Sequence, residues 1–163
     1  MKRLAVLLAF VSIVACGGPP PVPPLAHATR SAGLRIRLLP PPRELPSPPE
    51  VEALRKQVAE DLRAAGYEVI TRRGEPFDLD AGFDVAVDTE FRQLTMELRD
   101  DRDRGVDRVV LSFKPGVAPA KEPTRVSHTV VNAVATSPLL DQFAAEKKAK
   151  ANAPKDEPRT HAE

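Results

Sequence analysis

A dense acidic group surrounds Gly105 and is the first place to look for metal chemistry: Asp100, Asp101, Asp103 and Asp107. EF-hand calcium loops place oxygen ligands at alternate positions, a glycine at the sixth position and a glutamate at the twelfth. Counted from Asp101, the sixth position here is Val106 and the twelfth is Ser112. Four arginines interleave with the acidic residues and would neutralise them: Arg99, Arg102, Arg104 and Arg108. We therefore expect a solvated hairpin tip and no metal site.

The histidines and serines form no catalytic pattern. His27 and His161 lie in segments that we expect outside the folded domain, and His128 is expected on a helix surface or partly buried. Ser112 or Ser127 could serve as a nucleophile, but the chain has no G-x-S-x-G elbow and no evident acid–histidine pair. Glycine-rich loops of the phosphate-binding types are missing as well. We expect no enzyme, no metal and no cofactor, and the sequence does not indicate a ligand-binding site.

The elements that would position these residues follow from hydrophobic periodicity. Residues 34–38 alternate between apolar and basic side chains, which predicts a strand with Arg35 and Arg37 on its exposed face. A helix is predicted over about 48–65, where apolar residues recur every three or four positions. A second strand over 67–71 follows. Strand, helix and strand in this order predict a βαβ unit with parallel strands.

The middle of the chain favours further strands. Apolar residues alternate over 83–91, and their parity then shifts by one residue over 94–98. A β-bulge near 92–93 and a break into two strands are equally consistent with this shift. Another alternating run at 109–113 predicts an antiparallel hairpin across the turn at Gly105. Three acidic residues that precede or begin the first of these strands are explained as turn and edge residues: Asp78, Asp80 and Asp84.

Two helices complete the predicted fold. The first carries valines over 126–134, and the second begins at Ser137-Pro138, with serine as N-cap and proline at the first helical position. Leu139, Leu140 and Phe143 are expected to be buried. The elements predict an α+β fold, a two-layer sandwich in which a mixed sheet of about four strands carries helices on one face. The order is β-α-β-β-β-α-α within one domain, residues 34–148, and a disordered polar tail follows at 149–163.

The only cysteine of the chain, Cys16, follows a short apolar segment. Lys2 and Arg3 precede residues 4–15, which are almost entirely apolar. Twelve residues are too few for a membrane-spanning helix, which needs about 20, but they fit the apolar region of a secretory signal. We therefore expect residues 1–15 to be a signal peptide.

The tetrad Ile13-Val14-Ala15-Cys16 resembles the lipobox of bacterial lipoproteins, in which the cysteine is lipidated. This resemblance implies cleavage before Cys16, a diacylglyceryl thioether on that residue, usually with a third acyl chain, and stable attachment to a membrane without a transmembrane helix. Gly17, in place of an aspartate after the cysteine, resembles the enterobacterial sorting signal for the outer membrane. The expected location is therefore the bacterial cell envelope, at the outer membrane facing the periplasm.

A proline-rich segment separates the cysteine from the predicted domain. Of the 18 prolines, 11 lie between Pro19 and Pro49. We expect residues 16–33 to be a lipidated tether, whose residues 17–33 could hold the domain up to ~50 Å from the membrane as a polyproline II helix. A docking segment for a proline-recognising module is the functional alternative.

Composition excludes some partners. After cleavage the chain has 22 Lys+Arg against 23 Asp+Glu, so its net charge is −1. A nucleic-acid-binding domain would be basic, and a lipid-headgroup site would need a polybasic patch. The membrane, reached through Cys16, and another envelope protein are the expected partners.

The order of elements resembles small domains of envelope-assembly lipoproteins, namely the lipopolysaccharide-assembly lipoprotein family and the lipoprotein activators of penicillin-binding proteins. The resemblance covers most of 34–145, including the runs Ala64–Ile70 and Ser137–Leu139. It is architectural and transfers no functional residue. It implies a non-enzymatic adaptor or assembly factor, which would dock through the exposed face of the first strand or the hairpin edge. The alternative is a carrier or binding module for lipid, glycan or peptidoglycan.

Overall fold

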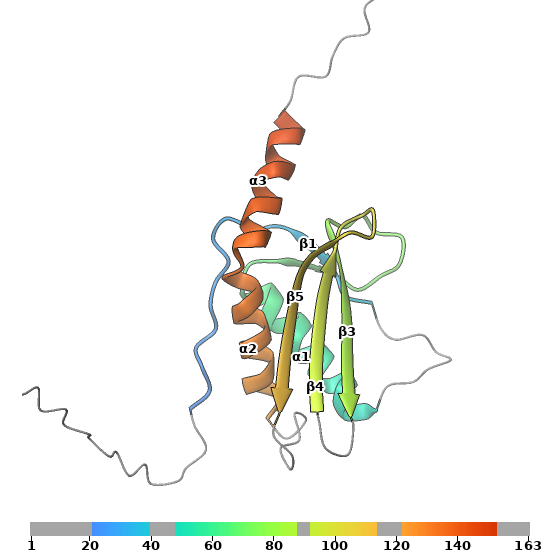
Figure 1. Ribbon diagram of the computed structural model, residues 1–163, viewed down its shortest axis with the longest axis vertical. Coiled ribbons are helices and arrows are strands. Elements are labelled where there is room, and N and C mark those ends of the chain that lie inside the picture. The colour runs from blue at the N-terminus through green and yellow to red at the C-terminus, as the bar shows by residue number, and fades with distance from the viewer. Residues whose placement is uncertain (1–20, 40–47, 88–91, 114–121, 153–163) are drawn as a thin grey trace, which may run out of the picture.

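The computed structural model describes residues 21–39, 48–87, 92–113 and 122–152 as one mixed five-stranded sheet with three helices (Figure 1). The predicted α+β class is confirmed, and the predicted number of about four strands is one too few. The signal peptide, Cys16 and residues 153–163 of the predicted tail lie outside the described residues. In chain order the elements are β1 (Arg35–Arg37), α1 (Pro49–Ala64), β2 (Glu68–Ile70), β3 (Leu79–Val87), β4 (Arg92–Arg99), β5 (Gly105–Phe113), α2 (Pro123–Ala135) and α3 (Pro138–Asn152).

The additional strand is β4, where the hydrophobic parity shifts. β3 and β4 pair antiparallel from Asp80 opposite Arg99 to Val87 opposite Arg92, so the shift marks a change of strand. The bulge lies elsewhere, in the pairing of β4 with β5 at the Leu98–Arg99 step. β3 also begins earlier than its hydrophobic pattern suggests, because polar residues and a glycine occupy the solvent face of its first half.

The strand order in the sheet is β2-β1-β3-β4-β5. β1 is parallel to both β2 and β3, which confirms the predicted parallel pairing around α1. β1 therefore has a neighbour on each side, and β2 and β5 form the edges. Gly66 ends α1 with a φ of 104°, a conformation that side chains with a Cβ rarely adopt.

The helices lie on one side of the sheet and share its core (Figure 1). Alternate residues of β4 project toward them, and register places Met96 opposite Phe83 and Leu98 opposite Ala81 on this face. The valine-rich segment is helical as predicted, because α2 buries its valines against α1 and the sheet. Large side chains that are fully buried include Ile36, Leu54, Leu62, Leu94, Met96, Leu98 and Leu140.

α3 differs from its prediction in three details, the first of which is that Phe143, expected to be buried, is only partly buried. Ser137 caps it as expected, since its Oγ accepts the Leu140 N–H at 3.3 Å. Leu139 was expected to be buried but is 51% exposed, because Leu140 and Ala144, one turn apart, occupy the inward face. The helix continues to Asn152, past the predicted domain boundary at 148. Within the described parts of the chain, no helix is long and apolar enough to cross a membrane.

Candidate functional site

Residues 23–33, which we call the strap, lie against the domain and are not a free tether. Two side chains of α2 bind the first part of the strap, and the partners lie more than 100 residues apart in the sequence. The hydrogen bonds join His128 Nδ1 and Pro23 O (2.7 Å), Asn132 Nδ2 and Pro24 O (2.9 Å), and Ala26 N and Asn132 Oδ1 (2.7 Å). His128 is partly buried, which agrees with one of its two predicted placements.

The second part of the strap binds the end of α1. The Ala28 N–H donates to Ala65 O at 2.8 Å, and the Gly33 N–H donates to Gly66 O at 2.9 Å. Leu25, Ala26 and Ala28 pack against the hydrophobic core. In Figure 1 the blue strap runs beside α2 toward α3 before it enters β1.

The predicted tether is therefore shorter than its composition suggests. Only residues 17–22 separate Cys16 from the first strap contact at Pro23, and the seven residue steps from Cys16 to Pro23 would span about 22 Å in polyproline II. This value replaces the ~50 Å expected for residues 17–33. If Cys16 carries the lipid, the strap holds the domain close to the membrane.

A hollow of about 390 Å³ lies at the other end of the sheet, between the β4–β5 hairpin, the segment before β3 and the second half of α3. Two phenylalanines and several charged residues line it. The lining residues are Phe77, Asp78, Asp100, Asp101, Arg102, Arg104, Phe143, Glu146, Lys147, Lys150 and Ala151. Its two most buried carboxylates, Asp78 and Asp100, are 7% and 5% exposed.

Asp78 joins three separate segments of the chain. Its carboxylate accepts the Arg35 N–H at 2.8 Å, the Arg35 guanidinium at 3.1 Å, and the Lys147 ammonium of α3. Burial acts to raise the pKa of Asp78, but the hydrogen bonds from Arg35 and Lys147 outweigh it, so its pKa is lowered from the ordinary value. Asp78 is therefore an anion already occupied by donors, and it links α3 to the sheet.

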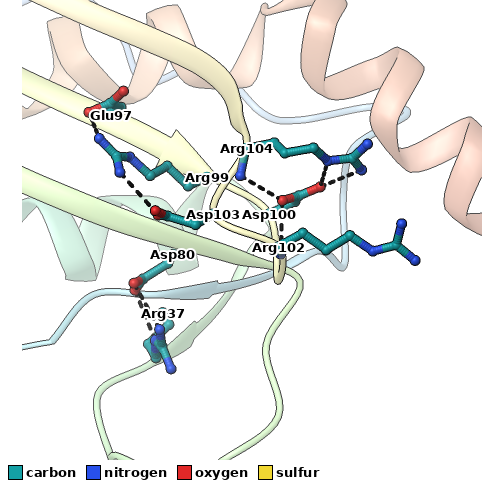
Figure 2. Close-up of polar contacts among 8 residues, drawn as sticks. All are labelled: Arg37, Asp80, Glu97, Arg99, Asp100, Arg102, Asp103 and Arg104. Atoms are coloured by element: carbon teal, nitrogen blue, oxygen red, sulfur yellow. Dashed lines mark hydrogen bonds and ion pairs between the residues drawn. The ribbon is translucent and has the colours of Figure 1, made fainter.

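Asp100 shapes the turn of the β4–β5 hairpin. Its carboxylate accepts the N–H groups of Arg102 and Arg104, both at 2.9 Å, and the Arg104 guanidinium at 2.8 Å (Figure 2). The hydrogen bonds from the Arg104 side chain and backbone lower the pKa of Asp100. Across the residues that the structure describes, no group of three or more His, Cys, Asp or Glu residues could hold a metal ion.

Ion pairs of Arg37 and Arg99 lie on the exposed side of the sheet and at the hairpin (Figure 2). Arg37 binds Asp80 through two hydrogen bonds of 2.8 Å, and its guanidinium lies 3.6 Å from the centroid of the Phe77 ring. Arg99 binds Glu97 at 2.9 Å and Asp103 at 3.0 Å, contacts that raise its pKa. The exposed face of β1, a predicted docking surface, therefore presents paired charges.

The two candidate nucleophiles lie apart. Ser127 is fully buried, and its Oγ donates to the Asp61 carboxylate between α2 and α1. His128 Nε2 lies 3.8 Å from the same carboxylate, but its Nδ1 contacts the strap. A substrate could not reach this serine in the described conformation. Ser112 lies on β5, an edge strand, where its side chain is exposed.

Replacing Asp78 with asparagine should lower the free energy of unfolding at pH 7 by about 1–2 kcal/mol. Loss of a buried charged acceptor costs about 1–3 kcal/mol, and the partial exposure of Arg35 and Lys147 reduces this value. Because folding lowers the Asp78 pKa, its contribution is full above the ordinary value of 3.8 and is lost as the pH falls through the folded-state pKa. Urea unfolding at several pH values should show the two proteins converging in acid.

Asp84→Asn is the matched control for this substitution, since Asp84 is an exposed residue of β3, the strand that follows Asp78. It should leave stability nearly unchanged across the same pH range. A stability difference for Asp78→Asn that does not shrink as the pH is lowered from 3.8 into strong acid would contradict the role assigned to its ionised carboxylate.

Comparisons with known proteins add no function. No family model matches the chain, and no curated protein matches it. One solved structure of similar fold is a dodecamer of a PelC variant from Paraburkholderia phytofirmans, with 13% identity, coverage of 68% of this chain and 92% of that chain, and a TM-score of 0.43. Another is protein XCC0632 from Xanthomonas campestris, of the DUF330 family, with 11% identity, coverage of 78% and 97%, and a TM-score of 0.41. Both similarities are weak, and neither assigns this chain to a family.

Proposed function

We propose that this chain is a lipid-anchored protein of the bacterial cell envelope and that its domain is a non-enzymatic adaptor or assembly factor for another envelope component. The proposed anchor is the acylated Cys16, and the proposed location is the periplasmic face of the outer membrane. The membrane, through this anchor, and an envelope protein are the proposed partners.

The docked strap is the observation that carries this proposal. A flexible tether would let the domain explore a wide zone around its anchor, whereas hydrogen bonds from His128 and Asn132 fix where the chain leaves the domain. The first contact lies seven residues after Cys16. Such an arrangement suits a protein that works by holding a surface at a defined distance and orientation.

The buried carboxylates of the domain have structural partners. Asp78 and Asp100 accept several hydrogen bonds each, and Asp61 accepts hydrogen bonds from Gln57 and Ser127. A general base needs a carboxylate or imidazole within reach of a substrate proton. These carboxylates are instead used to join helices, strands and the hairpin.

Replacing Cys16 with alanine should abolish membrane attachment, because the acyl chains have no other site in the proposed scheme. Two or more acyl chains anchor a protein stably, at about 0.8 kcal/mol per buried CH₂. Fractionation with a carbonate wash, together with mass spectrometry of the N-terminus, should show an unprocessed or soluble protein. Ser12→Ala, within the same leader, should be processed normally. An alanine variant that stays in the washed membrane fraction would show the anchor assignment to be wrong.

The adaptor role is tested separately, by crosslinking in cells with identification of partners by mass spectrometry. Recovery of one stoichiometric envelope protein supports it. Recovery of bound lipid or glycan without a protein partner would favour the carrier alternative. The hollow beside α3 gives that alternative little support for lipid, since charged residues make up most of its lining.

A further inference from the structure

We propose that the surface of α2 on which the strap lies is a binding site for extended, proline-rich peptide segments. The strap occupies this site until such a segment of another protein takes its place. The inference rests on the proposed adaptor function and names the chemistry of the partner. Its starting point is the strap itself, which Figure 1 shows beside α2.

The site binds backbone atoms in a fixed order. His128 donates through Nδ1–H to Pro23 O at 2.7 Å, since a carbonyl oxygen can only accept. Asn132 donates through Nδ2 to Pro24 O at 2.9 Å and accepts the Ala26 N–H through Oδ1 at 2.7 Å. Two donors are thus followed by one acceptor. Proline suits the first two positions because it has a C=O and no N–H, so it leaves no donor without a partner there.

Proline also prepares a segment for this site. Its ring fixes φ and favours polyproline II, so a proline-rich segment loses less conformational entropy on docking than a flexible one. Leu25, Ala26 and Ala28 add apolar contact with the core. Each hydrogen bond that the structure describes between α2 and the strap ends on a backbone atom of the strap. The site therefore selects an extended backbone with small or aliphatic side chains, and many sequences meet this requirement.

The outer part of the strap can leave the domain without unpacking the core. Within the described residues 21–30, every residue is exposed or only partly buried. Firm attachment begins at Ser31, which is fully buried and whose Oγ lies 3.1 Å from the Tyr67 hydroxyl. A competing segment therefore has to replace only surface contacts, and β1 keeps its place when residues 23–30 are displaced.

The strap has an advantage over a partner because it belongs to the same chain. A segment attached through a short flexible linker acts at an effective concentration in the millimolar range. A segment of another protein must compete with it. Weakening the strap's own contacts, with α2 left unchanged, should therefore strengthen binding of an added peptide.

Fluorescence anisotropy with a labelled peptide of residues 21–30 provides the test. The protein is the chain from residue 16 onward, with Cys16→Ala so that it carries no lipid. Ala26→Pro in the protein removes the N–H that Asn132 accepts. We expect this variant to bind the peptide about fivefold or more tightly than the protein with the unaltered strap. Leu25→Asp, which removes an apolar contact of the strap, should have the same effect.

Two changes should weaken binding to the Ala26→Pro protein by about fivefold or more. One is Asn132→Ala, since the peptide then loses two hydrogen bonds. The other is proline at the Ala26 position of the peptide, which removes its N–H. The matched control is Gln93→Ala, which truncates an amide next to the buried Leu94, on the face of β4 that points away from the helices. It should leave the affinity within about twofold.

Three results would overturn the proposal. Equal affinity of the unaltered protein and both strap variants would mean that the peptide binds elsewhere. Absence of saturable binding to the Ala26→Pro protein at about 1 mM peptide would mean that the surface holds only its own strap. A dimer in light scattering that Ala26→Pro abolishes would show that the site takes the strap of a second copy. Failure of the adaptor function would instead appear in the crosslinking experiment and would leave these peptide affinities unchanged.

Discussion

Replacing Leu62 with alanine should lower the free energy of unfolding by about 2–5 kcal/mol, the range for deleting a buried leucine side chain. Leu62 is fully buried on the inner face of α1, within the cluster that joins the sheet, α1 and α2. Truncation removes apolar contacts and leaves a cavity that the neighbouring strands and helices can fill only in part. Domains of this size are stable by only about 5–15 kcal/mol in total, so this single change would remove a large share.

Leu139→Ala is the matched control, since it deletes the same atoms from a helical leucine that is 51% exposed. This substitution should lower the free energy of unfolding by less than about 1 kcal/mol. Urea unfolding of the two variants, with equal m-values, measures both effects. Equal destabilisation by the two substitutions would contradict the packing of α1 against the sheet, or the outward orientation of Leu139.

Local patterns in the sequence were sufficient to predict most elements. The alternation at 34–38 and the three- to four-residue spacing over 48–65 reflect which face is buried, so β1 and α1 follow from them. The start of β3 was harder to predict, because Asp80, Gly82 and Asp84 are residue types typical of turns. Asp80 lies there because Arg37 of the neighbouring strand binds it, and that pairing is visible only once β1 and β3 are adjacent.

The hollow and the strap depend on contacts between distant segments. Asp78 and Lys147 are 69 residues apart, and neither is unusual in its own sequence context. The acidic residues near Gly105 resemble part of a calcium loop in sequence, but Asp100 accepts hydrogen bonds from Arg102 and Arg104 of its own turn. The strap has few apolar residues, so its composition indicated a free tether. Its hydrogen bonds to side chains of α2 and to the end of α1 show that it is docked.

Replacing Asn132 with alanine should raise the population of the released strap while leaving the domain folded. The side chain of Asn132 donates to Pro24 O and accepts the Ala26 N–H, so its loss removes two hydrogen bonds at once. Because both hydrogen bonds are partly or largely exposed, we expect their loss to weaken docking of the strap by about 1–2 kcal/mol. This corresponds to about a 5- to 30-fold rise in the population of the released strap.

Hydrogen exchange at Ala28 and Gly33 measures this release, because their N–H groups bind the end of α1 only when the strap is docked. Gln142→Ala, on an exposed helical amide that bonds Glu146 and makes no hydrogen bond to the strap, should leave exchange at both positions unchanged. In the membrane-bound protein, release of the strap would raise the largest distance between the lipid anchor and the domain from about 22 Å toward ~50 Å. A fluorophore on an Arg108→Cys variant should then move away from quencher-bearing lipids. Unchanged exchange together with unchanged quenching would mean that Asn132 does not set how far the domain is held from the membrane, since both signals depend on the same contact.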